Sequence, residues 1–401
     1  MPKTFFGLGP TVGTYAERVA LVSPEIGQLF YQTDTDEYLE YSAFNGSNRW
    51  VQAAPRANKN FVINGGMGVA QRGVTSAGST TGGYLTCDRW TGAISSLGTW
   101  TNTQENDAPV GIGKSWKWLC TTADASPAAA DFALVRQGVE GQNLQTLLKG
   151  TAAAKLCNVS FWVKSNVVGT YVLYLNDNVN TRIICGSYSI SSVNTWEYKT
   201  VTLAGDTVGA LTNSNVVGIY LSFGLAFGSN YTSAPLQTSW STGQTGLGTG
   251  QVNVAAAVNN YWQITGVQWE VGSAPSEFEF ETFETTLRKC QRYFCKTFSY
   301  GTVPASNAGQ PGSLLFPKAS TTAAGGAYAQ TWRFPVEMRD APNPITTYSP
   351  SAAGANFFDE AGGAVLVAVG QIGTGGVFVY NSGAAVVGRN AVIHVTAQSE
   401  L

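Results

Sequence analysis

Short runs of aromatic and β-branched residues, separated by Gly, Asn and Ser, fill the central part of this 401-residue sequence. Alternation of this kind is typical of β-strands joined by turns. The clearest strand candidates are "NVSFWVKS" (158–165), "TYVLYLND" (170–177), "WEYKTVTL" (196–203), "VVGIYLSFGLAF" (216–227) and "YWQITGVQWEV" (261–271). We therefore predict an all-β protein in which residues 58–281 form a β-sandwich of the jelly-roll type.

The last of these strand candidates has a break in its alternation at Gly266. In a regular strand, Trp262 and Ile264 share one face, and the three apolar residues after the glycine share the opposite face: Val267, Trp269 and Val271. One extra residue in the strand would bring all five to the same side. The sequence therefore predicts a β-bulge at Gly266.

Two smaller β regions flank the predicted sandwich. Residues 1–57 carry hairpin signals and are predicted to form an N-terminal β meander, with the acidic stretch "TDTDE" (33–37) in a hairpin turn. So short a meander has little core of its own. We expect it to pack against neighbouring copies or a larger assembly, followed by a linker at 53–60. Residues 298–401 are predicted to form a C-terminal β knob.

The stretch "SEFEFETFETTLRKCQRYF" (276–294) changes its period midway. Glu277, Glu279 and Glu281 alternate with phenylalanine, which predicts a strand with a solvated acidic face. Two other readings remain open for these carboxylates. Alternate strand positions are about 6.6 Å apart, which permits a glycosidase acid pair. Calcium ligation is the third reading.

Beyond Glu281 the apolar residues recur at helical spacing, and we predict a helix over 282–297 that links the sandwich to the knob. Its basic residues lie off the apolar stripe. The stripe consists of Phe283, Leu287, Cys290 and Phe294.

Composition excludes several classes of function. Charged residues make up 12% of the chain and the formal net charge is -2, so there is no basic footprint for nucleic acid. The longest apolar run, 364–369, is far too short to span a membrane, and the N-terminus has no secretory signal pattern. We expect no membrane insertion.

Residues suited to metal or nucleophilic chemistry are few. Six dispersed cysteines with a single histidine predict reduced, buried thiols and no metal site or other cofactor. His394 alternates within "AVIHVT", and no nucleophile elbow accompanies it. We predict a structural histidine and a protein that is not an enzyme, with no catalytic residues.

Several segments in order resemble a known family. The sequences "NFVINGGMGVAQRG" (60–73), "CDRW" (87–90), "FWVKS" (161–165), "WQITGVQWEVGSAPSEFEF" (262–280) and "CQRYF" (290–294) resemble the carbohydrate-binding-module-like β-sandwich of tail fibres and receptor-binding proteins in tailed bacteriophages. "FPVEMRDAP" (334–342) resembles the tip domain that often follows it. Residues 18–41 resemble a short module seen near the start of such fibres. Trp269 departs from the family pattern, which more commonly has leucine.

This resemblance implies a homotrimer in the virion tail, assembled in the host cytoplasm. Its N-terminal segment would attach to phage tail, baseplate or adaptor proteins, and its C-terminal region would face the host. In such a trimer we expect the apolar stripe of the helix, Phe283, Leu287, Cys290 and Phe294, to form the trimer interface.

Sugar binding requires exposed aromatic faces flanked by hydrogen-bonding groups. Candidate glycan-binding residues are Tyr231 and Trp240 in the long polar insertion 228–250, and Trp332, Tyr348 and Tyr380 in the C-terminal region. The alternative for each ring is packing in a core or between subunits. We predict adsorption to a bacterial surface glycan, lipopolysaccharide or capsule, without bond cleavage. A tailspike depolymerase (a glycoside hydrolase) and a non-binding structural spacer of the tail are the alternatives.

Overall fold

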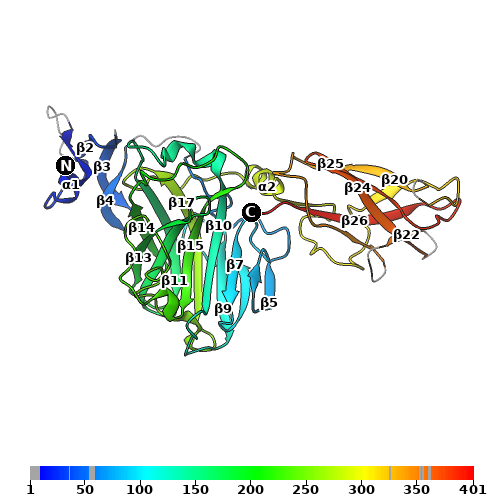
Figure 1. Ribbon diagram of the computed structural model, residues 1–401, viewed down its shortest axis with the longest axis horizontal. Helices are drawn as coiled ribbons and strands as arrows, with labels where there is room; N and C mark the ends of the chain where they lie inside the picture. Colours follow the sequence, from blue (N-terminus) through cyan, green and yellow to red (C-terminus); the bar gives the residue numbers. More distant parts are fainter. Residues whose placement is uncertain are drawn as a thin grey trace.

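The computed structural model describes residues 10–401 except Asp36, 54–58, 325–326, 352–353, 355 and 360–362. The chain forms a row of β units (Figure 1), with the N-terminal sheet at the left, a large sandwich in the middle and a C-terminal domain at the right. The described residues include two α-helices, α1 (Tyr15–Val19) and α2 (Phe283–Gln291). The predicted all-β class is confirmed. No helix among the described residues is both long and apolar enough to cross a membrane.

The N-terminal sheet has four strands, β1 (Thr11–Gly13), β2 (Leu29–Gln32), β3 (Glu37–Phe44) and β4 (Ser47–Gln52). Strands β2, β3 and β4 form the predicted meander, with a hairpin turn between Gln32 and Glu37, but β1 pairs parallel to β2. A plain meander was therefore too simple a prediction. Most of the predicted linker, 54–58, lies outside the described residues.

This small sheet packs on the sandwich of its own chain. Its core of Phe30, Leu39 and Trp50 includes Ala274 from the sandwich. The buried Arg18 donates from Nε to Gln32 Oε1 at 2.8 Å and from Nη2 to Ser273 Oγ at 3.3 Å. The N-terminal sheet was expected to pack against neighbouring copies or a larger assembly. In the structure it packs against the turn of its own chain that contains Ser273 and Ala274.

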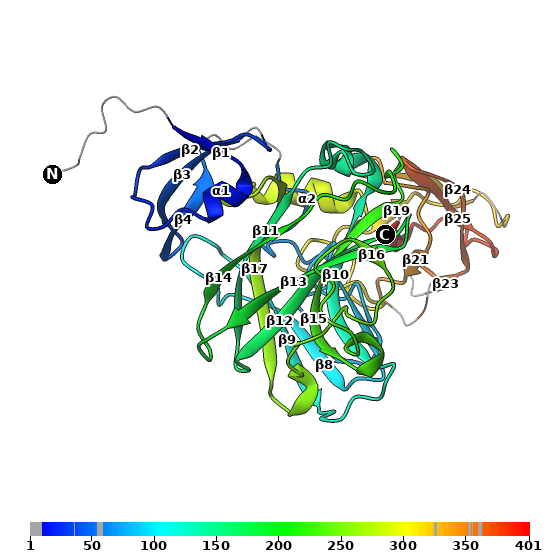
Figure 2. The same cartoon turned by 60° about the vertical axis from the view of Figure 1, so that its left-hand side comes forward.

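The sandwich consists of two sheets lying face to face (Figure 2). The seven-stranded sheet has the order β16-β13-β12-β15-β10-β7-β6, and the six-stranded sheet has the order β14-β11-β17-β9-β8-β5. The strands are β5 (Thr75–Ser79), β6 (Gly82–Gly83), β7 (Thr91–Ser95), β8 (Thr99–Glu105), β9 (Ser115–Thr122), β10 (Phe132–Glu140), β11 (Cys157–Ser165), β12 (Gly169–Asp177), β13 (Arg182–Ile190), β14 (Glu197–Leu203), β15 (Val217–Phe227), β16 (Ser241–Thr242) and β17 (Tyr261–Val271). Three short 3-10 helices are η1 (Gly141–Leu147), η2 (Ser229–Tyr231) and η3 (Val254–Ala256).

Large rings fill the space between the two sheets. Burying each removes a large apolar surface from water, which makes this core the main source of stability. Six fully buried tryptophans belong to it: Trp90, Trp100, Trp116, Trp118, Trp262 and Trp269. All six cysteines are buried and free of disulfides, as predicted, and burial raises the pKa of the Cys157 thiol to about 12.

The predicted bulge in β17 is confirmed. Ser160 pairs with Gln268 while Trp162 pairs with Thr265, so Phe161 alone faces two residues of β17. Gly266 has the left-handed φ of +60° that such a bulge requires. The apolar residues on both sides of it, Trp262, Ile264, Val267 and Trp269, all belong to the core, and Val271 packs against that core.

Replacing Gly266 with alanine is expected to destabilise the sandwich by about 1–2 kcal/mol from backbone strain alone, because residues with a Cβ disfavour this conformation. The new Cβ would also lie 2.8 Å from Ile112 Cδ1. Thermal unfolding measures the effect. The matched control is Gly113→Ala nearby, where a Cβ meets nothing within 4 Å. Equal melting temperatures for the two variants would contradict a strained bulge.

The insertion 228–250 covers the outer face of the seven-stranded sheet. Leu134, Val172 and Tyr174 point away from the central core and form a second apolar cluster with Leu247. Leu236, also from the insertion, packs against that cluster. The insertion is therefore part of the folded sandwich.

The described residues of the C-terminal domain form nine strands: β18 (Phe294–Lys296), β19 (Leu314–Phe316), β20 (Ala329–Arg333), β21 (Ile345–Tyr348), β22 (Phe357–Asp359), β23 (Ala364–Val365), β24 (Val367–Gly373), β25 (Gly376–Asn381) and β26 (Ala391–Gln398). Strand β26 pairs with β18, β19, β21 and β22, and a separate sheet has the order β20-β25-β24. Their inner faces form one core that contains Phe316, Tyr328 and Phe357.

The linking helix is shorter than predicted. Thr282 caps α2, which ends at Gln291, and Phe294 belongs to β18, where it pairs with Gln398. The predicted stripe is therefore divided between two elements. Phe283 is exposed and Leu287 half-buried, whereas Cys290 and Phe294 are buried inside this chain.

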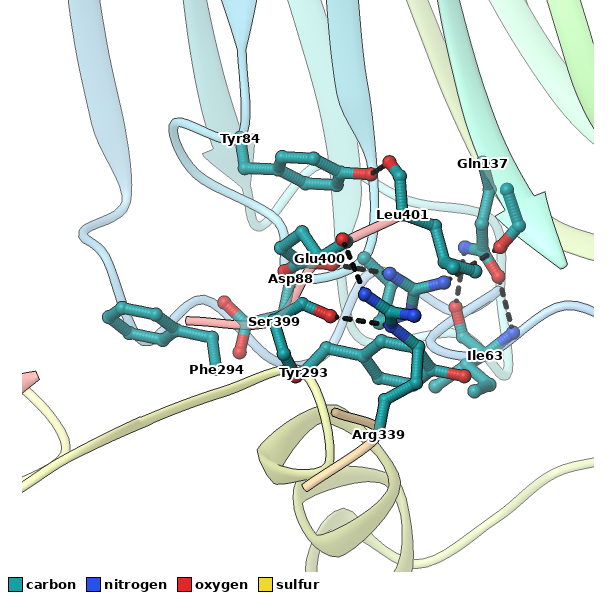
Figure 3. Close-up of polar contacts among 12 residues, drawn as sticks. Ile63, Tyr84, Asp88, Gln137, Tyr293, Phe294, Arg339, Ser399, Glu400 and Leu401 are labelled. Atoms are coloured by element: carbon teal, nitrogen blue, oxygen red, sulfur yellow. Dashed lines mark hydrogen bonds and ion pairs between the residues drawn. The ribbon is translucent and has the colours of Figure 1, made fainter. Parts of the chain in front are cut away.

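The sandwich and the C-terminal domain meet in a polar joint, shown in Figure 3. Glu400 is paired with Arg89 and, at 3.0 Å, with Arg72. The guanidinium of Arg89 lies 3.4 Å from the centroid of the Tyr293 ring, and Tyr84 donates its hydroxyl to the Leu401 carbonyl at 2.6 Å. The joint therefore fixes the two parts by directed contacts between largely buried groups.

Candidate functional site

The rings predicted to bind glycan do not converge on one surface. Tyr231 and Trp240 hold the insertion on the sandwich: Tyr231 packs edge-on against Phe132. Trp240 packs against the central core and donates from Nε1 to the Ala204 carbonyl at 2.7 Å. Both rings have structural roles that their polar surroundings in sequence did not indicate.

Two of the three C-terminal candidates are also packing residues. Trp332 is buried in the core of the C-terminal domain and packs edge-on against Phe334. Tyr348, on β21, packs edge-on against Phe298. Trp332 and Tyr348 therefore have the packing role that was the alternative to glycan binding.

Tyr380 lies in different surroundings. Along β25, Val377 and Val379 enter the core, so the alternation of the strand directs Phe378 and Tyr380 to the outer face of the sheet. Their rings are half-buried and nearly parallel, with centroids 5.5 Å apart and an interplanar angle of 25°. Together they form a small aromatic surface.

A pocket of about 300 Å³ opens beside Phe378. We call it the ring pocket. Its lining comes from all three strands of the sheet: Thr331, Arg333, Gln371, Gly373, Gly375, Gly376 and Phe378. Its volume is at the small end of the range of about 300–1,000 Å³ usual for ligand sites.

An irregularity in β24 positions one side of the ring pocket. The register between β24 and β25 shifts between Gly370 and Gly373, and Gln371 within this shift has a left-handed φ of +48°. Glutamine seldom adopts this conformation, and such strain and bulges are concentrated at functional sites. Here they place an exposed amide at the edge of the pocket.

The chemistry of the ring pocket suits a sugar. An aromatic face can hold the C–H side of a pyranose, while a hydroxyl, an amide and a guanidinium can hydrogen-bond its oxygens. The described residues that line it supply no carboxyl, imidazole or thiol group. The sequence analysis identified Tyr380 next to this pocket. Alternation could have added Phe378, but nothing local marked Arg333 or Gln371.

The three glutamates of 276–281 are arranged differently from their predicted strand, because this segment has no regular secondary structure. Glu279 Oε2 accepts from the Asn60 backbone N–H at 3.0 Å, and Glu281 pairs with Lys289 of α2. Glu277 is exposed. The predicted strand is therefore wrong.

A second, more apolar pocket of about 190 Å³ lies between this segment and the loop that follows Asn60. Its lining includes Gly66, Ile112 and Phe278. Phe280 and Phe283 also contribute to it, with 75% and 46% of their surface exposed. Two exposed phenylalanines beside a pocket mark this side of the chain as a candidate contact surface.

His394 has the predicted structural role. Its ring stacks on Phe298 at 3.8 Å, Nδ1 lies 3.0 Å from Thr297 Oγ1, and Nε2 lies 3.0 Å from the Gly309 carbonyl oxygen. Burial lowers the pKa of the imidazole. Both nitrogens therefore have partners within the fold.

No protein-family model matches the chain, and no curated protein matches its sequence. Among solved structures, it is similar to the enzymatically active domain of tailspike protein 4 from bacteriophage CBA120, with 14% identity and a TM-score of 0.30 over 53% of this chain and 21% of that chain. It is also similar to a family 11 carbohydrate-binding module from Clostridium thermocellum, with 8% identity and a TM-score of 0.27 over 50% of this chain and all of that one (100%). Discoidin II from Dictyostelium discoideum is similar over 74% of this chain and 87% of its own, with 9% identity and a TM-score of 0.16.

Proposed function

We propose that this chain is a receptor-binding tail protein of a bacteriophage, and that it adsorbs to a glycan of the bacterial surface, lipopolysaccharide or capsule. The observation that carries the proposal is the ring pocket, where aromatic, hydroxyl, amide and guanidinium groups meet on an exposed sheet face. The N-terminal sheet lies at the opposite end of the chain (Figure 1). This arrangement suits attachment at one end and recognition at the other.

The same proposal includes a homotrimer in the virion tail, held through its N-terminal segment by tail, baseplate or adaptor proteins. Exposed Phe280 and Phe283 give the chain an apolar surface that another copy could cover. Three linked copies would raise the avidity of a weak single site by orders of magnitude.

Binding without bond cleavage is part of the proposal. A glycoside hydrolase needs two carboxyl groups that act on one bond. Glu279 and Glu281 have separate partners, the Asn60 backbone and Lys289. This arrangement favours binding over the depolymerase alternative.

Replacing Phe378 with alanine is expected to weaken the labelling of host cells by fluorescent protein at least about tenfold. Burying a phenylalanine side chain contributes about 1.5–3 kcal/mol, and 1.4 kcal/mol is a factor of ten in affinity. The control is Tyr38→Ala, an exposed ring of the N-terminal sheet. A spacer would label no cells even as wild type, and a depolymerase would release reducing ends from host polysaccharide. Full labelling by the Phe378 variant would place the site elsewhere.

A further inference from the structure

We infer that the glycan bound in the ring pocket carries an anionic substituent, a carboxylate or a phosphate, and that Arg333 binds it. The inference rests on the proposed glycan-binding function and specifies the class of sugar. The observation behind it is that the Arg333 guanidinium has no counterion among the described residues that line the ring pocket.

Arg333 is exposed, and within the described part of the chain no hydrogen bond or ion pair engages its guanidinium. Most other arginines of this chain are held by partners of the fold. Arg182 binds Asp206 through two nitrogens at 2.7 and 2.9 Å, and Arg292 binds Glu140 at 3.0 Å. Arg333 differs from them in facing a pocket with its donors unused.

The strand register places this guanidinium beside the aromatic surface. Thr331 pairs with Phe378, and Arg333, two residues along the same face of β20, pairs with Gly376. Gly376 has no side chain and lines the ring pocket together with Arg333 and Phe378. No side chain from this position therefore covers the space between the Phe378 ring and Arg333.

The chemistry of arginine favours an anion in that space. Its planar fork binds a carboxylate or phosphate through two parallel hydrogen bonds. The described lining of the ring pocket contains no acid that competes for it. Glu337, which follows β20 in the chain, accepts a hydrogen bond from the Thr374 hydroxyl at 2.8 Å. A sugar stacked on Phe378 would thus present its charged substituent to Arg333, with Thr331 and Gln371 beside it.

The test measures binding of the full chain to purified host polysaccharide in three forms: native, carboxyl-reduced and dephosphorylated. Wild type is expected to lose at least tenfold in affinity for one of the two modified forms, which identifies the anion. Arg333→Gln is expected to bind the native polysaccharide at least tenfold more weakly than wild type does. Its affinity should not fall further for the polysaccharide form that lacks the anion. Arg333→Lys keeps the positive charge but lacks the planar fork of the guanidinium. Its affinity for the native polysaccharide should lie between those of wild type and Arg333→Gln.

The control variant is Arg288→Gln, another exposed arginine, on α2. Equal losses in both variants would indicate unspecific charge attraction and overturn the inference. Equal binding of wild type to all three polysaccharides, or full binding by Arg333→Gln, would also overturn it while glycan binding stands. If wild type binds no glycan at all, the proposed function itself fails. Unchanged thermal unfolding of each variant establishes that it is folded.

Discussion

Replacing Lys149 with methionine is expected to lower the free energy of unfolding of the sandwich by about 3–5 kcal/mol, the usual cost of removing one partner from a buried ion pair. The Lys149 side chain is 3% exposed, and its Nζ lies 2.5 Å from Asp177 Oδ2 and 3.0 Å from Asp206 Oδ2, whose side chains are 0% and 2% exposed. It also donates to the carbonyls of Val208 and Gly209, at 3.0 and 2.7 Å. Methionine fills similar space but leaves these oxygens without their cation.

Arg182 compensates only part of this loss. Burial by itself would raise the pKa of Asp206, but Arg182 and Lys149 together hold that pKa below its ordinary value. Asp177 keeps backbone donors from Val179 and Asn180 but no ion-pair partner among the described residues. We therefore expect the loop that contains Asp206 to separate from β12 before the rest of the sandwich unfolds.

Chemical denaturation followed by tryptophan fluorescence measures this prediction, since the sandwich core contains the buried tryptophans. The matched control is Lys164→Met. Lys164 pairs with Asp107, whose side chain is 51% exposed, and surface pairs of this kind contribute about 0–1 kcal/mol. Similar denaturation midpoints for the two lysine variants would contradict a stabilising role for the buried ion pairs of Lys149 with Asp177 and Asp206.

Replacing Glu400 with alanine is expected to loosen the C-terminal domain from the sandwich, at a cost of about 3 kcal/mol or more. Burial alone would lower the pKa of Arg89, and Glu400 beside it raises that pKa above its ordinary value. Without this carboxylate, two guanidinium groups in the joint lose their shared counterion. Arg72 keeps a longer ionic contact to Asp88, at 3.7 Å, and a hydrogen bond from Nη2 to Gln398 Oε1 at 3.2 Å.

Small-angle scattering should then show a broader distribution of overall dimensions, and limited proteolysis should cut near α2. The control is Glu337→Ala, an exposed glutamate of the C-terminal domain. A joint that stays closed in the Glu400 variant would mean that the aromatic contacts, such as Phe294 under Arg72 at 3.8 Å, hold it without the ion pairs.

Local sequence was sufficient where a structural feature depends on neighbours along the chain. The parity of the apolar residues around Gly266 specified a bulge, because only an extra residue brings both groups to one core. The turn between β2 and β3 followed in the same way from its polar residues.

Long-range pairing decided the features that were predicted wrongly. Phe294 continues the helical stripe in sequence, but pairing with Gln398 places it in a strand. Glu279 lies in an alternating segment, yet its backbone N–H donates to the Gln268 side chain rather than to a neighbouring strand. Neither partner can be identified from the segments themselves.

The candidate site was partly predictable for the same reason. Tyr380 stands out by residue type, and alternation places Phe378 beside it. The significance of Arg333 depends on which acids lie near it after folding, and Gln371 depends on an irregularity of β24. A sequence pattern contains neither kind of information.

Strand β26 has a kinetic consequence for the C-terminal domain. It joins partners far apart along the chain, Leu314 with Ile393 and Phe294 with Gln398, so large loops must close before these contacts form. Topologies dominated by such distant pairings fold slowly and leave apolar edges uncovered meanwhile. We therefore expect the domain that bears the ring pocket to reach its native state in higher yield when the chain is produced slowly or in the presence of chaperones.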